Sequence, residues 1–186
     1  MSGASYAGTA VVFEGMPLRE IRDPVIAGQG PASMRAAAEA LAGVAERLRD
    51  INAQMVAIER AYVEVHEGTA AESTAAYLRR LGEPGRVGAY SFGSAAQALQ
   101  DQAQHYSAAN TELAGIQTLD TAAGTRAAAQ LSDGNRQKAA DAANRYQENA
   151  NHTLATAFPA FIPVSLPTPD PAPAPVPEPP AWPQVS

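Results

Sequence analysis

The sequence predicts an all-α fold: an elongated antiparallel helical hairpin or bundle, followed by a disordered proline-rich C-terminal tail. Alanine-rich segments carry apolar residues in steps of three and four, which is the spacing of helices that pack lengthwise on one another. The chain has only four Phe and one Trp, so its core is expected to be thin and helix-on-helix. Of the 15 prolines, 11 lie at or after Pro159, so residues 159–186 are assigned to the tail.

Residues 1–30 form a polar, glycine-containing lead. Pro17 and Pro24 are expected to limit any helix to a short one between them, because proline lacks the N–H that a helix interior needs. Leu18, Ile21, Val25 and Ile26 are apolar enough to pack on the main body. The lead is therefore predicted to be a short helix and a loop docked on a helical domain spanning residues 31–158.

The first long helix is predicted over residues 31–66. Pro31 suits the first helical position, where a missing N–H costs nothing. An uninterrupted apolar seam then follows in steps of three and four. Its members are Met34, Ala37, Leu41, Val44, Leu48, Ile51, Met55, Ile58, Tyr62 and Val65.

A bend at His66, Glu67 and Gly68 separates this helix from the next one. The second helix is predicted over residues 69–81, with Gly68 or Thr69 as its cap and Glu72 in its first turn. Residues 82–88 are predicted to interrupt it, because they hold a proline and three glycines. Periodicity resumes over residues 90–118 at Phe92, Ala96, Leu99, Ala103, Tyr106, Asn110 and Leu113.

The last helix is predicted over residues 120–157, weakened at Ser132–Asn135. Short connections between helices favour antiparallel neighbours. The whole domain is therefore expected to be a long hairpin or bundle of three main helices.

Charge and composition argue against several function classes. The formal charge is −6 and Lys138 is the sole lysine, so no basic cluster is available for nucleic acid. The chain has no cysteine, which excludes disulfides and thiolate metal sites. It contains no apolar run of about 18 residues, so no transmembrane segment is expected, and its first residues do not look like a cleaved secretory signal.

The sequence offers no catalytic, cofactor or metal site. His66 beside Glu67 begins like a zincin motif, but the second histidine of that motif would fall at Ala70. The glycine-containing segments 28–33 and 82–88 lack the strand context and the Gly-Lys-Ser/Thr ending of a phosphate loop. We therefore expect a protein that is not an enzyme.

Three phrases resemble a known family. The lead "FEGMPLREIRDPVIAGQGPAS" is similar to the opening of actinobacterial PPE-like domains. The bend "HEGTAAES" resembles the Trp-x-Gly turn of type VII (ESX) secretion substrates, with His66 in the place of tryptophan. The segment "NRYQENANHTLATAFPAFIP", ahead of a proline-rich tail, is similar to the end of such domains, and the matches together cover most of residues 11–165.

The resemblance implies a PPE-like helical domain that pairs with a small helical-hairpin protein of the PE or WXG type. It implies export without a cleaved signal peptide, from the cytoplasm to the cell envelope or outside, and contact with a type VII secretion chaperone and ATPase. The family's Tyr-x-x-x-Asp/Glu export signal is absent from this chain, and in PPE-type pairs that signal usually lies on the partner. The residues assigned to helix pairing are Leu41, Val44, Leu48, Ile51, Met55, Ile58, Tyr62, Leu99, Tyr106 and Leu113.

Two alternatives stay open at this point. The first is a self-associating structural or adaptor protein, for example in envelope or phage assembly, whose tail recruits a proline-recognising domain. The second is a monomer in which the three main helices bury one another's apolar faces. The mass in solution separates these from a heterodimer.

Overall fold

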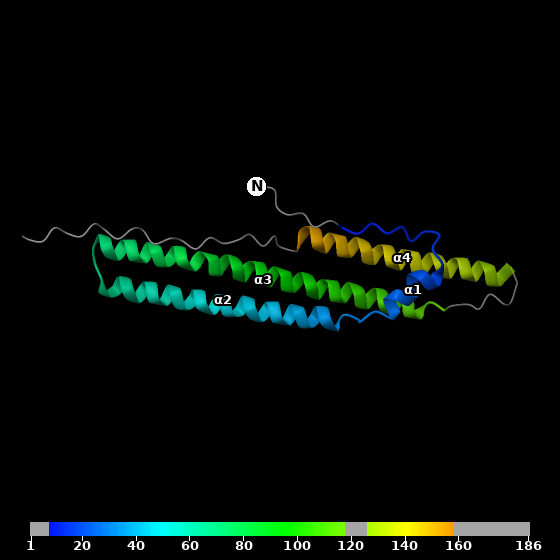
Figure 1. Cartoon of the computed structure of the whole chain (residues 1–186), viewed down its shortest axis with the longest axis horizontal. Helices are drawn as coiled ribbons and strands as arrows, with labels where there is room; N and C mark the ends of the chain where they lie inside the picture. The colour runs from blue at the N-terminus through cyan, green and yellow to red at the C-terminus, as the bar shows by residue number, and fades with distance from the viewer. Residues whose placement is uncertain (1–7, 118–125, 158–186) are drawn as a thin grey trace, which may run out of the picture.

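The computed structural model describes residues 8–117 and 126–157, and within them it confirms the all-α prediction. The described chain contains four helices, α1 (Leu18–Ile26), α2 (Ala32–Val65), α3 (Thr69–Gly115) and α4 (Arg126–Thr156). Helices α2 and α3 form a long antiparallel hairpin, α4 lies along α3, and α1 packs at the end opposite the bend (Figure 1). The predicted tail and the predicted helix start near Asp120 lie outside the described residues.

Helix α3 corrects the prediction of an interruption at residues 82–88, because it runs unbroken for 47 residues and includes Pro84. Two of the glycines lie where α2 comes closest. A Cβ on Gly82 would be 3.0 Å from Asn52 Oδ1, and one on Gly88 would be 3.2 Å from Leu48 Cδ1. Close helix packing therefore explains these glycines, and it outweighs their low helix propensity.

A surface ion pair also lies in this segment of α3. The Arg86 side chain donates through Nε to Glu83 Oε2 over 2.9 Å, one turn apart on the helix. This hydrogen bond, together with the guanidinium charge, lowers the pKa of Glu83. The pair favours helix across Pro84 and Gly85.

Helix α4 is likewise continuous through Ser132–Asn135, where a weakening was predicted. Helix α1 also differs from its prediction, since it continues two residues beyond Pro24. Contacts with α3 hold that last turn: the Tyr106 hydroxyl donates to the Val25 carbonyl over 2.6 Å, and the Asn110 amide donates to the same oxygen over 3.2 Å. Proline near a helix end removes only one helical hydrogen bond, which these contacts offset.

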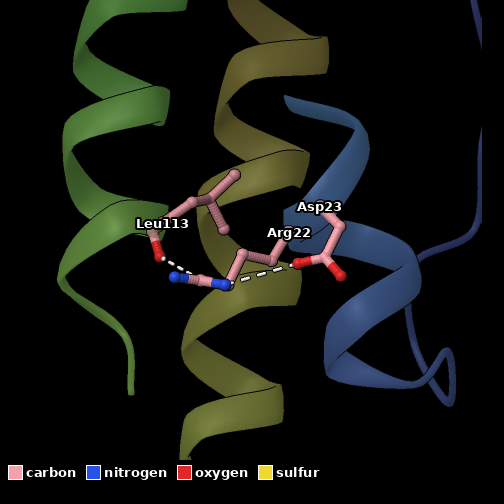
Figure 2. A network of polar contacts seen from close by, with 3 residues as sticks. All are labelled: Arg22, Asp23 and Leu113. Carbon is pink, nitrogen blue, oxygen red and sulfur yellow. Dashed lines mark hydrogen bonds and ion pairs between the residues drawn. The ribbon is translucent and has the colours of Figure 1, made fainter. Parts of the chain in front are cut away.

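The larger buried side chains gather where α1, α3 and α4 meet. Ile21 of α1 and Leu113 of α3 pack there with alanines of α4 such as Ala139. Arg22 closes this end, because its Nε donates to the Leu113 carbonyl over 3.2 Å while Nη1 contacts Asp23 at 3.3 Å (Figure 2). The Leu113 carbonyl in the last turn of α3 thus accepts from both the guanidinium and the Ile116 N–H, and the positive charge lies at the C-terminal end of the helix, where it is favourable.

An extended N-terminal strap, which we define as residues 8–16, runs beside α4 (Figure 1). The Asn151 amide bonds both the N–H and the carbonyl of Thr9, at 2.9 and 2.8 Å. The Gln147 amide does the same to Val11, at 2.7 and 3.2 Å. The strap is therefore held through its backbone, and it leads the chain into α1.

Candidate functional site

Half of the predicted seam of α2 faces α3. Leu41, Leu48, Met55 and Tyr62 are half-buried. The positions that complete this inner face are Ala38, Ala45, Asn52 and Glu59, of which the two alanines are buried at 4 and 0 % exposure. The contact with α3 is thus centred on small and polar residues that the apolar pattern did not include.

The other half of the predicted seam is open. Val44, Ile51, Ile58 and Val65 expose 38, 50, 57 and 74 % of their surface. They belong to a second stripe in steps of three and four that runs the length of α2 and is exposed at every position. We call this stripe the open seam; its members are Ala37, Ala40, Val44, Arg47, Ile51, Gln54, Ile58, Ala61 and Val65.

Helix α3 carries a stripe of half-buried and buried residues in steps of three and four. We call it the α3 stripe; its members are Tyr77, Leu81, Pro84, Gly88, Ser91, Ala95, Ala98 and Gln102. In the second half, Ala95 and Ala98 are 0 and 1 % exposed, and the Gln102 amide donates to the Tyr146 hydroxyl of α4 over 3.0 Å. In the first half, Tyr77–Ser91, every member is half-buried, and Gly88 lies against Leu48 of α2.

The open seam and the first half of the α3 stripe lie on the same side of the hairpin. The Tyr62 hydroxyl donates to Thr74 Oγ1 over 3.5 Å, and Leu48 lies against Gly88. These contacts put one flank of α3 beside the flank of α2 that adjoins the open seam. Arg79 pairs with Glu59 at 2.7 Å on the other flank.

The geometry of this face suits another helix. From Ala37 to Val65 the open seam is about 42 Å long at 1.5 Å per residue. Alanine and glycine on both helices permit close approach, and β-branched residues repeat every seven positions, as in a coiled-coil seam. A hairpin laid on this face would meet the open seam with one helix and the α3 stripe with the other.

The three residues assigned to pairing on α3 pack within the chain instead. Leu113 is 0 % exposed in the core with α1 and α4. Tyr106 is half-buried, bonded to Val25 and edge-on to Tyr146 with 6.1 Å between ring centroids. Leu99 is half-buried as well. Of the predicted pairing residues, the exposed ones are therefore Val44, Ile51 and Ile58.

The bend is held by an aromatic stack. His66 lies flat on Tyr62 with centroids 4.2 Å apart and planes 11° apart, and its Nδ1 is 3.1 Å from the Tyr62 carbonyl. Gly68 has φ +93°, a conformation that favours glycine, and it is the N-cap of α3 without a side-chain cap bond. Of the two caps predicted for this helix, Gly68 is the one observed, and neither Thr69 nor Glu72 forms a side-chain cap bond.

A shallow groove lies on the opposite side of the hairpin, with a volume of about 300 Å³. Its floor includes Ala45, Gly93 and Ala96, and Arg35 and Arg49 line it. Arg35 donates to Ser107 Oγ over 3.2 Å. This groove is a second and more polar surface of the hairpin.

Across residues 8–117 and 126–157, no three His, Asp or Glu side chains cluster as metal ligands. In the same ranges, no helix combines the length and apolarity required to cross a bilayer. Comparison with family models and with curated proteins finds no match for the chain.

Proposed function

We propose that the chain is a non-enzymatic partner-binding protein whose open seam and α3 stripe receive a small helical-hairpin protein. The observation that supports this most is the exposure of every position of a heptad-spaced stripe that includes Val44, Ile51 and Ile58. Burying such a stripe removes apolar surface from water, at roughly 25 cal/mol per Å². Contiguous exposed apolar surface of this kind marks interaction sites.

The α3 stripe supports a helix as the occupant. In the second half of that stripe, Gln102 already donates to Tyr146 of the chain's own helix α4. A partner helix over Tyr77–Ser91 would extend the same packing towards the bend. Together with a helix on the open seam it would complete a four-helix bundle.

The resemblance to PPE-like domains gives this pairing a biological setting. In that setting the chain is a substrate of a type VII secretion system, exported together with its partner by a route without a cleaved signal peptide. A secretion chaperone and the secretion ATPase are the further partners. Culture-filtrate proteomics with and without that ATPase tests the export: the chain is expected in the filtrate only when the ATPase is present.

Co-expression with a small helical-hairpin protein, sought among the genes beside that of this chain, tests the pairing. Size-exclusion chromatography with light scattering is expected to give a mass equal to one copy of each chain. Separate elution of the two proteins would overturn the heterodimer.

A second copy of this chain is the alternative occupant, as in a structural or adaptor protein. Antiparallel pairing of two open seams sets large residues against small ones, with Val44 facing Ala61 and Val65 facing Ala40. A discrete homodimer mass of the chain on its own would favour this alternative.

A further inference from the structure

One charged residue lies inside the open seam. Arg47 occupies the seam between Val44 and Ile51, and its side chain is exposed. The other members of the seam are apolar or small, except Gln54. A docked helix would therefore cover a guanidinium near the middle of an apolar contact.

Arg47 has no ion pair within the part of the chain that the structure describes, a property that it shares with Arg49 and Arg60 of α2 but not with two arginines of α3. Arg79 pairs with Glu59, and Arg86 pairs with Glu83. The residues four positions from Arg47 are Gly43 and Ile51, neither of which bears a charge. The carboxylate of Asp50, three positions on, does not lie within ion-pair distance.

Covering an unpaired arginine is costly, because the charge loses water and gains nothing in return. A partner carboxylate placed against Arg47 offsets this cost, because the planar guanidinium can donate two parallel hydrogen bonds to it. A partner lacking that carboxylate would be rejected, and so would a register that moves it away.

We infer that Arg47 is the specificity-determining residue of the open seam, and that its partner is a helix bearing an Asp or Glu side chain opposite Arg47 within an otherwise apolar stripe. The inference rests on the proposed function. A shift of one heptad would bring that carboxylate opposite Ala40 or Gln54 and leave Arg47 unpaired, so the single ion pair also fixes the register.

The test titrates purified variants with the small helical-hairpin protein of the co-expression experiment and measures Kd by calorimetry. Arg47→Gln removes the charge without adding apolar surface, and it is expected to weaken binding at least about tenfold, as expected for removing one member of a covered charge pair. Arg60→Gln is the matched control, because Arg60 is also an exposed arginine of α2 but lies outside the open seam. Its Kd is expected to stay within about twofold of the wild type, as for a rim charge.

A charge exchange gives the second readout. Arg47→Glu is expected to weaken binding further, and replacing one carboxylate of the partner by lysine is expected to restore it. Equal Kd values for the wild type and Arg47→Gln would overturn the inference while leaving the pairing intact. Failure of the wild-type chain to bind at all would overturn the proposed function, and the inference with it.

Discussion

At the residue scale, the bend has His66 at the position where the Trp-x-Gly turn that it resembles has tryptophan. The face of the His66 ring lies on Tyr62, whose hydroxyl reaches across to Thr74 at the start of α3. The stack and the contact from Nδ1 to the Tyr62 carbonyl both act at the C-terminal end of α2. We therefore expect the stability of the bend to depend on a flat aromatic ring at residue 66.

Replacing His66 by alanine is expected to destabilise the hairpin by about 1 kcal/mol, the order of one aromatic pair. That loss corresponds to a fall in Tm of about 2–4 °C for a chain of this size. His66→Trp keeps a ring against Tyr62 and is expected to unfold closer to the wild-type temperature. Thermal unfolding followed by circular dichroism checks this, and an unchanged Tm for His66→Ala would show that the stack contributes nothing.

The glycines of α3 differ from one another in what surrounds them. A Cβ on Gly85 would have no atom within 4 Å, whereas one on Gly88 would be 3.2 Å from Leu48 Cδ1. Gly85 therefore carries the entropic cost of glycine in a helix without a packing reason. Gly88 carries the same cost but permits the approach of α2.

Gly85→Ala is expected to raise the free energy of unfolding by about 0.5–1 kcal/mol, because alanine restricts the unfolded chain and favours helix. Gly88→Ala is expected to raise it less, or to lower it, because Leu48 must move. Urea unfolding of the two variants measures the difference. An equal gain in both would mean that Gly88 does not set the distance between α2 and α3.

At the scale of elements, the sequence predicted the helices better than it predicted their contacts. The first long helix was expected over residues 31–66 and is observed at Ala32–Val65. Its apolar pattern selected the large residues, such as Ile51 and Ile58. The tightest packing instead involves Ala38 and Ala45, because the smallest side chains allow two helices to approach most closely.

The same physics explains the unpredicted continuity of α3. Pro84 and its flanking glycines disfavour helix locally, but Gly82 and Gly88 pack against α2. Tertiary contacts therefore outweigh propensity. The sequence predicts that the lead docks on the helical domain but not that α4 receives it, although Asn144, Gln147 and Asn151 form a polar stripe in steps of three and four.

At the scale of the whole molecule, the hairpin has two unlike sides. One side carries the open seam and the first half of the α3 stripe. The other carries the shallow groove with Arg35 and Arg49, and Val63 continues that flank of α2 in steps of seven residues. We propose that a helical partner binds the first side.

A matched pair of substitutions tests this claim most directly. Ile58 and Val63 lie on the same helix with 57 and 51 % exposure, so aspartate at either position should leave the monomer folded. Ile58→Asp is expected to weaken binding of the helical-hairpin partner at least about tenfold, because it places a charge in the covered seam, and Val63→Asp is expected to leave the Kd unchanged. Equal binding by both variants, or loss of binding by Val63→Asp alone, would contradict the assignment of the partner to the open seam.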